Sequence, residues 1–314
     1  MDLLKIPNEY YPMLFDRHGE LRDGGSTSCA VFSGDEKYFL RVIKPAFFDT
    51  AITGVEIQVF LHGKGFPVPP VVLTEENLPY IKTGDAVYIL YEFIEGSESN
   101  PEQDAEAIGE LVGSLHHVMK EYPGCMGKHD AKRPASPGQL AKRDKQFYIG
   151  RYIDLLRQKQ YTRVDDFYVY GDLLWDKVKD LPYGFCHGDM YVGNIHKTPE
   201  GKLYLLDFDT SCEGFPMYDP ALICNRTDYF NYDESGYGKS KAILSRFLTG
   251  YMKHNFLSQA EIDAFFDLIA LYHFALQATI LEIHGLDSCD NLFFDKQLDW
   301  LYKWREQCAK EART

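Results

Sequence analysis

The chain has 314 residues, which is enough to bury a large core and to form two domains or lobes. Its formal net charge of -14, from 47 acidic and 33 basic residues, argues against an electrostatic nucleic-acid binder, because such proteins need a basic face. Hydrophobic residues make up 45% of the chain and its 7 cysteines include no Cys-x-x-Cys pair, so we expect a globular cytoplasmic protein with reduced thiols rather than a disulfide or zinc framework.

The N-terminal part of the chain predicts strands and one helix. Residues 30–45, AVFSGDEKYFLRVIKP, contain two strand-like runs around a Ser-Gly-Asp-Glu turn, which indicates a β-hairpin. Residues 50–65 are typical of a helix that stops at Gly63, and the prolines that follow force the chain to be extended. Residues 86–96 are typical of a buried strand that ends at a glycine.

From about Pro101 onward the pattern becomes helical. Residues 105–124 predict a helix with one apolar face, formed by Ile108, Leu111, Val112, Leu115 and Met119. Residues 258–285 predict another helix, which begins with a capping box and ends at a glycine. We therefore expect an N-terminal, nucleotide-binding α+β lobe over residues 1–95 and a larger, mainly helical lobe over residues 96–314.

The most apolar segment of the chain is LIALYHFALQATIL, residues 268–281, flanked by Asp267 and Glu282. It falls short of the roughly 20 residues that a membrane span needs. A buried helix is therefore the better interpretation, and we expect no membrane association.

The segment FCHGDMYVGNIHKTPEGKLYLLDFD, residues 185–209, predicts a β-hairpin around the Thr-Pro-Glu-Gly sequence of a type I turn. If the turn closes symmetrically, residue i faces residue 399 minus i, and Asn194 lies opposite Leu205. Side chains two apart share a face, so Asn194 and Asp207 would lie on one face, roughly 7 Å apart along the strand. Their oxygen atoms could then bind one ion, and such ligands suit Mg²⁺.

Asp189 precedes Asn194 by five positions and is flanked by glycines that allow a tight loop. A carboxylate beside a metal site is suited to orient a hydroxyl group and to accept its proton. An Asp-x4-Asn sequence followed by a strand that ends in Asp is the arrangement of kinase-type phosphotransferases. A turn-forming role explains each of these residues singly, but it does not explain the spaced set.

The sequences HGDMYVGNI and LLDFD together resemble the catalytic and metal-binding signature of the aminoglycoside phosphotransferase family, which also holds choline kinases. Other landmarks follow in the order typical of the family, over most of the chain. DGGSTSCAVF resembles its phosphate-covering loop, YFLRV the strand with its phosphate-binding base, and LYEFIEG its hinge. The resemblance implies an α+β, two-lobed fold like that of protein kinases.

The resemblance also implies cofactors and roles for particular residues. ATP and Mg²⁺ are the implied cofactors, Asp189 the implied catalytic base, and Asn194 and Asp207 the implied Mg²⁺ ligands. The implied nucleotide contacts are the glycine loop, a base with its orienting carboxylate, and the hinge backbone: Gly24, Gly25, Ser26, Thr27, Ser28, Arg41, Glu56, Glu92 and Ile94. His187 and Asp219 are implied to be structural supports.

The chain departs from the family pattern at several positions. Family members often have Lys where this chain has Arg41, although Arg also binds phosphate, through a bidentate fork. Lys44 is an alternative phosphate ligand, but its odd spacing from Arg41 places it on the other face. Asp209 stands where protein kinases have Gly. Only eleven residues separate Asp207 from Asp219, which leaves little room for a protein-kinase activation segment.

Two other patterns do not indicate a phosphate-binding loop or a metal site. SGYGKSK, residues 235–241, contains Gly-Lys-Ser but lacks the earlier glycine of a P-loop, so we expect a loop that leads into a helix over residues 241–253. Three histidines fall on predicted helices without the spacing of metal ligands: His116, His117 and His273. We therefore expect them to be core or surface residues rather than metal ligands.

The sequence as a whole predicts transfer of the ATP γ-phosphoryl group to a hydroxyl group of a small molecule. Two alternatives stay open: a protein Ser/Thr kinase of the same fold, and a catalytically silent ATP-binding regulatory module. A metal-dependent hydrolase is the least supported class. The sequence indicates neither the oligomeric state nor a preference between ATP and GTP.

The acceptor class rests on charge. The net charge and the acidic residues of the variable helical region motivate the hypothesis of an aminoglycoside-like or other amine-bearing acceptor: Asp228, Asp233, Glu234, Glu282 and Asp287. A solvated acidic surface explains the same residues equally well.

Overall fold

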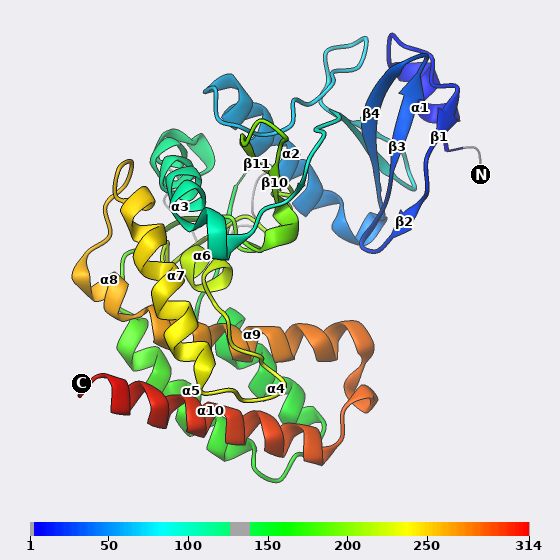
Figure 1. The fold of residues 1–314 in the computed structure, drawn as a ribbon. Helices are drawn as coiled ribbons and strands as arrows, with labels where there is room; N and C mark the ends of the chain where they lie inside the picture. Colours follow the sequence, from blue (N-terminus) through cyan, green and yellow to red (C-terminus); the bar gives the residue numbers. More distant parts are fainter. Residues whose placement is uncertain (1–2, 126–138, 314) are drawn as a thin grey trace. The chain divides into compact units, whose positions relative to one another are not determined.

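The structure is a computed structural model, which describes residues 3–125 and 139–313 (Figure 1). Packing divides the chain into two compact units. Unit 1 consists of residues 1–99, 191–211 and the described part of 118–141, and unit 2 of residues 100–117, 142–190 and 212–314. The chain therefore passes between the units several times, whereas the sequence suggested one boundary near residue 95. The assignment of separate functions to residues 1–95 and 96–314 stays a prediction.

Unit 1 contains an antiparallel sheet with the strand order β1-β3-β4-β6-β5, and β2 pairs with β3. The strands of this sheet are β1 (Arg17–His18), β2 (Arg22–Asp23), β3 (Ser26–Ser33), β4 (Glu36–Ile43), β5 (Ile81–Lys82) and β6 (Val87–Glu92). The predicted hairpin is confirmed as β3 and β4, with Gly34 at a φ of 59° in the turn. The predicted strand over residues 86–96 is also present, but it ends at Glu92.

The two faces of this sheet bury different helices because side chains alternate along each strand. Val31, Leu40 and Leu90 belong to the core cluster that includes residues near helix α1 (Lys5–Tyr10). Ile43 and Ile89 belong to the cluster under α2 (Phe48–Gly63), which is the helix predicted over residues 50–65. The second face also carries the polar side chains described below.

A smaller sheet in unit 1 has the order β11-β10-β7, with β7 (Ser97–Glu98), β10 (Ile195–Lys197) and β11 (Leu203–Leu205). The predicted type I turn is present, because the Gly201 N–H donates to the Thr198 carbonyl oxygen at 2.9 Å. Gly201 has a φ of 88°, and this extra left-handed residue shifts the pairing, so that Ile195 faces Leu205. The expected symmetric register was therefore wrong by one residue.

Unit 2 is mainly helical. Its helices are α3 (Pro101–Val118, which runs one residue into unit 1), α4 (Arg151–Gln158), α5 (Val164–Val178), α6 (Tyr218–Ile223), α7 (Ser235–Tyr251), α8 (Gln259–Asp263), α9 (Phe265–His284) and α10 (Asn291–Glu311). A short sheet has the order β8-β12-β9, with β8 (Ala141–Lys142, whose first residue belongs to unit 1), β12 (Cys212–Gly214) and β9 (Gly184–Cys186). All five apolar residues predicted on one face of α3 and its final turn are buried.

The C-terminal helices confirm two predictions and correct a third. The capping box of Ser258 and Glu261 is present, although the helix breaks after one turn and resumes as α9. Among the described residues, α9 is long and apolar enough to cross a membrane, but 56% of its most apolar window is buried inside the protein, as in a core helix. The expected loop over residues 235–241 was wrong, because α7 begins at Ser235. There Gly236 packs closely and the buried Ser240 hydroxyl donates to its carbonyl oxygen.

Candidate active site

A cavity of about 640 Å³ lies within unit 1, between the large sheet and the segment that carries β10 and β11. Most of the predicted nucleotide and metal residues line it: Ser26, Ser28, Arg41, Glu92, Ile94, Asn194 and Asp207. The other predicted residues are not part of its lining: Gly24, Gly25, Thr27 and Glu56. A second cavity, of about 680 Å³, lies in unit 2 and includes none of the predicted site residues.

The predicted glycine loop is the turn of a tight hairpin between β2 and β3. The Gly24 N–H donates to the Ser26 carbonyl oxygen at 3.0 Å. Ser26 and Ser28 are two apart in β3, so their side chains point to one face, and both residues line the cavity. The Lys44 ammonium donates to the Gly24 carbonyl oxygen at 2.9 Å and is not part of the cavity lining, whereas Lys37 and Arg41 of β4 both line it.

Arg41 carries a bidentate ion pair. Its Nη2 lies 2.7 Å from Oδ2 of Asp209 and its Nη1 lies 3.3 Å from Oδ1 of the same carboxylate, while Nη1 also lies 3.5 Å from Oδ1 of Asp207. The Arg41 side chain is only 13% exposed. Burial by itself lowers the pKa of Arg41, but the neighbouring Asp209, Tyr91 and Asp207 hold it above its ordinary value. The cation is therefore permanent and already neutralised by carboxylates.

The resemblance implied that Glu56 orients Arg41, and the structure gives Arg41 another partner. No ion pair joins Glu56 to Arg41 within residues 3–125 and 139–313. Burial raises the pKa of Glu56, which lies in α2. The same helix approaches Asp209 at Gly54, where an added Cβ would lie 2.8 Å from the Asp209 Oδ1 atom. The close approach of α2 at a glycine thus leaves room for Asp209 beside Arg41.

The hinge segment follows β6 along the edge of the cavity. The Glu92 N–H donates to the Pro70 carbonyl oxygen at 2.9 Å, which fixes the strand end. The Ile94 N–H has no hydrogen-bond acceptor in the part of the chain that the structure describes. Phe93 stands between these residues, and the Lys37 ammonium lies 3.6 Å from the centroid of its ring. A backbone donor at Ile94 is therefore available at the cavity wall.

Asn194 and Asp207 line the same cavity, but not for the reason that the sequence suggested. The Leu206 N–H donates to the Asn194 carbonyl oxygen at 2.9 Å, so Asn194 lies beside Leu206. Continued pleating would then put Asn194 and Asp207 on opposite faces. Asp207 instead has a φ of 57°, a left-handed conformation that Asp tolerates better than most residues, and this turn of the backbone re-aims its side chain.

Asp189 belongs to unit 2, where the buried Asp219 holds the preceding backbone. The Asp219 carboxylate accepts hydrogen bonds from the N–H groups of His187 at 2.7 Å and Gly188 at 2.9 Å. The Asp189 N–H then donates to Nδ1 of His187 at 3.3 Å. These contacts support the implied structural roles of His187 and Asp219.

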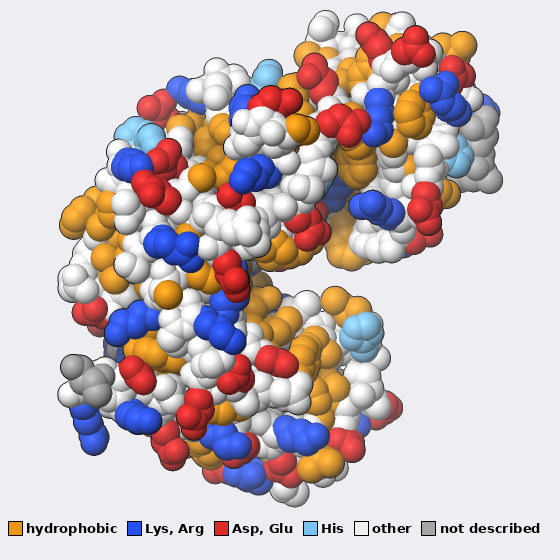
Figure 2. Space-filling model, in the orientation of Figure 1, with side chains coloured by type: hydrophobic (Ala, Val, Ile, Leu, Met, Phe, Trp, Pro, Cys, Tyr) orange, Lys and Arg blue, Asp and Glu red, His pale blue; other side chains and the backbone are white. Residues whose placement is uncertain are grey.

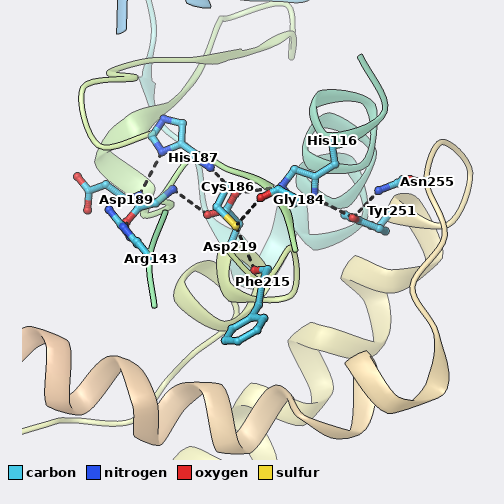
Figure 3. A network of polar contacts seen from close by, with 11 residues as sticks. His116, Arg143, Gly184, Cys186, His187, Asp189, Phe215, Asp219, Tyr251 and Asn255 are labelled. Carbon is cyan, nitrogen blue, oxygen red and sulfur yellow. Dashed lines mark hydrogen bonds and ion pairs between the residues drawn. The ribbon is translucent and has the colours of Figure 1, made fainter. Parts of the chain in front are cut away.

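A wider network surrounds this carboxylate, as Figure 3 shows. His116 on α3 contacts Asp219 through Nε2 at 3.0 Å and the Tyr251 hydroxyl through Nδ1 at 2.8 Å. Arg143 donates to the Gly188 carbonyl oxygen at 3.1 Å, and its guanidinium lies 4.4 Å from the ring centroid of Phe147. Burial raises the pKa of Asp219, but the hydrogen bonds from His116 and the backbone lower it below its ordinary value.

Comparison with known proteins identifies the family. Residues 20–255 match the model of the phosphotransferase enzyme family. The chain belongs to this family. An uncharacterised protein of Deinococcus radiodurans is 25% identical over 307 residues, which cover 91% of this chain and 84% of the relative.

Solved structures show the same fold at lower identity. An amicoumacin kinase in complex with AMP-PNP and Ca²⁺ superposes with a TM-score of 0.72 and 18% identity, over 97% of this chain and 92% of the other. A microcompartment-associated aminopropanol kinase gives a TM-score of 0.65 and 17% identity, over 96% and 93%. The expected kinase-like fold, with a β-rich N-terminal part and a mainly helical C-terminal part, is confirmed.

Sequence reasoning missed three long-range contacts around the candidate site. Asp209 was noted only as a departure from protein kinases, yet it is the nearest partner of Arg41. His116 is a buried histidine, as expected, but its contact with Asp219 was not foreseen, and Arg143 was not singled out. None has a local sequence signal, because each acts on a residue that is at least 45 positions away.

Proposed function

We propose that this protein transfers the γ-phosphoryl group of ATP, with Mg²⁺, to a hydroxyl group of a small molecule. The observation that carries the proposal is the cavity of about 640 Å³ in unit 1. It gathers a glycine-turn hairpin, one buried arginine, a hinge backbone, and an amide and a carboxylate at the end of a hairpin. This combination serves phosphoryl transfer, in which positioning and charge stabilisation supply most of the catalysis.

The nucleotide contacts follow from the chemistry of the lining. The Ile94 N–H can donate to a ring nitrogen of adenine, and the hydroxyl groups of Ser26 and Ser28 can donate to phosphate oxygens. The Arg41 guanidinium presents a planar fork of donors that matches two phosphate oxygens. Binding would then exchange part of its contact with carboxylates for a contact with phosphate.

The donor set at the end of the hairpin fits Mg²⁺. Asn194 offers an amide oxygen and Asp207 a carboxylate, and Mg²⁺ takes few protein oxygens while it keeps waters and phosphates as its other ligands. The metal, when bound, would neutralise charge on the transferred phosphoryl group. We therefore assign Asn194 and Asp207 as its protein ligands.

Asp189 is the proposed catalytic base. Its carboxylate would orient the acceptor hydroxyl and take its proton as the hydroxyl oxygen attacks the γ-phosphorus and the bond to the ADP oxygen breaks. The backbone that precedes it is fixed by two hydrogen bonds to the buried Asp219. A fixed base favours transfer because the reacting atoms start close to their transition-state geometry.

An amine-bearing acceptor is the finer proposal. Its support is that similar folds include proteins named as kinases of aminopropanol and, in Plasmodium vivax, of ethanolamine. The acidic residues give less support than expected, because Glu282 pairs with Arg151 and Asp287 with Lys159, each at 2.9 Å. Figure 2 shows acidic and basic side chains interspersed on the visible surface. The recognition of an ammonium group would therefore depend on other side chains.

The test is an ATP-dependent activity screen. The protein is incubated with ATP, Mg²⁺ and a panel of hydroxylated amines, neutral alcohols and hydroxy acids, and ADP release is measured together with the mass of each product. An acceptor that gains one phosphoryl group supports the proposal. Nucleotide binding without transfer to any acceptor, together with phosphorylation of a protein substrate, would favour the protein-kinase alternative.

A further inference from the structure

The Arg41 cluster, formed by Arg41, Asp207 and Asp209, lies at the centre of the proposed nucleotide site. One cation contacts two carboxylates, but the two contacts differ. Asp209 contacts both terminal nitrogens, at 2.7 and 3.3 Å, whereas Asp207 contacts one nitrogen at 3.5 Å. Their exposure differs in the same sense, since the Asp209 side chain is 18% exposed and the Asp207 side chain 43%. Asp209 is thus the stronger and better shielded partner.

The position of Asp209 is itself built into the fold. Gly54 of α2 packs against it, and a Cβ at Gly54 would lie 2.8 Å from the Asp209 Oδ1 atom and 3.0 Å from its backbone nitrogen. Contacts at those distances would force Asp209 to move. The Asp209 N–H also donates to Oδ1 of Asp207 at 3.4 Å, which ties the two carboxylates together. The glycine of α2 therefore sets where the Arg41 partner lies.

We propose that Asp209 is the positioning residue of Arg41, in the role that the family resemblance gave to Glu56. This inference rests on the proposed nucleotide site. Asp209 holds the guanidinium in a bidentate pair and aims it into the cavity. Asp207 remains able to leave Arg41 for another cation, because its contact is single, longer and more exposed. Arg at position 41 suits this arrangement, since a Lys ammonium could not pair with both oxygens in one plane.

The inference predicts an effect that does not need metal. If Asp209 positions Arg41, its loss weakens phosphate binding even without Mg²⁺. If Asp209 served only as a metal ligand, its loss would weaken binding only when Mg²⁺ is present. Binding of the non-hydrolysable analogue AMP-PNP, measured by calorimetry with EDTA and with Mg²⁺, separates these two roles.

Asp209→Asn is the main variant, because it keeps the shape and removes the charge. We expect it to weaken AMP-PNP binding in EDTA by about tenfold to a hundredfold, the range for losing a hydrogen bond to a charged group. Glu56→Gln should weaken binding less than Asp209→Asn does. In the Arg41→Lys background, Asp209→Asn should cost less than threefold, since residues that act through one contact are not additive.

A second variant tests the same idea without altering the charge. Gly54→Ala places a methyl group against Asp209, so it should weaken metal-free binding in the same direction. Gly63→Ala is its matched control, since Gly63 ends the same helix and has open space at its Cβ position. Thermal melting of each variant shows whether it is folded, and if Asp209→Asn does not fold, the comparison of Gly54→Ala with Gly63→Ala decides between the two roles.

The outcomes are distinct. Weaker metal-free binding in Asp209→Asn and Gly54→Ala, but not in Gly63→Ala, supports the inference. Unchanged metal-free binding in Asp209→Asn, or stronger coupling of Arg41 to Glu56 than to Asp209, overturns it and leaves the proposed function standing. Wild-type protein that binds no nucleotide under either condition overturns the proposed function and this inference together.

Discussion

Two carboxylate clusters in this protein are held in opposite ways. In the Arg41 cluster, the side chains of Asp207 and Asp209 are partly exposed, and a side-chain cation is shared between them. In unit 2, the Asp219 side chain is fully buried and accepts hydrogen bonds from two backbone N–H groups and from His116. Asp207 of the first cluster can exchange partners by rotating its side chain, whereas Asp219 of the second cannot do so without moving the backbone.

The comparison separates carboxylates that are suited to bind a ligand from a carboxylate that supports the backbone. The contact of Asp207 with Arg41 is long and its carboxylate is exposed, so it contributes little to stability and leaves Asp207 free to serve a ligand. A buried carboxylate that satisfies several donors is costly to remove, because each donor would be left without a partner. We therefore expect variants of the Arg41 cluster to affect nucleotide and metal binding, and variants around Asp219 to affect folding and the placement of Asp189.

The largest effect is expected at Asp189, which neither cluster can replace. Asp189→Asn should lower turnover by on the order of 10²–10⁴, because the variant cannot accept a proton. Nucleotide affinity should change little, since Asp189 does not line the cavity of unit 1. Steady-state turnover and calorimetric nucleotide binding check both statements. Turnover within a factor of three of the wild type would contradict the assignment of the base.

The second-largest effect is expected when the buried carboxylate of Asp219 is removed. Asp219→Ala leaves the N–H groups of His187 and Gly188 and the His116 ring without their acceptor. We expect a loss of about 3–5 kcal/mol in the free energy of unfolding, the range for breaking a buried charged contact. Urea unfolding measures this value. A loss below about 1 kcal/mol would remove the distinction between the two clusters.

For Asp207 of the Arg41 cluster we expect the opposite: a large effect on metal binding and a small effect on stability. Asp207→Ala should abolish the tightening of ATP binding by Mg²⁺, because the variant loses the only carboxylate assigned to the metal. Its free energy of unfolding should change by less than about 1 kcal/mol, as for other exposed ion pairs. Calorimetry with and without Mg²⁺ and urea unfolding test the two parts. Persistent tightening by Mg²⁺ would show that another group holds the metal.

The pH dependence of stability offers a milder test of the same comparison. The pKa of Asp219 in the folded protein lies below its ordinary value of 3.8, because hydrogen bonds from His116 and the backbone outweigh the effect of burial. The unfolded chain then binds this proton more tightly, so the stabilisation is present above about pH 4 and is lost as the pH falls through the lower folded pKa. Asp219→Asn should reduce this loss of the free energy of unfolding at low pH, whereas Asp207→Ala should retain it.

Local sequence patterns predicted the elements of the site, and long-range contacts decided its details. The glycine turn before β3, the hairpin around Gly201 and the sequence from Asp189 to Asn194 depend on turn residues and spacing, which a sequence shows directly. The one-residue shift of the hairpin depends on the left-handed conformation of Gly201, which a symmetric turn cannot anticipate. The pairing of Arg41 with Asp209 spans 168 positions, and no periodicity connects residues so far apart.

The smallest effect is expected on the acidic surface that motivated the amine-bearing acceptor. Glu282 contacts Arg151 at 2.9 Å, and its side chain is 40% exposed. A carboxylate that is already paired and hydrated has little attraction left for a substrate cation. Glu282→Gln should therefore change the acceptor KM by less than threefold, and the dependence of KM on ionic strength should match that of the wild type. A tenfold rise in KM, with loss of that dependence, would instead show that Glu282 leaves Arg151 to bind the acceptor. The pair of Glu282 and Arg151 would then exchange partners in the way expected of Asp207 in the Arg41 cluster.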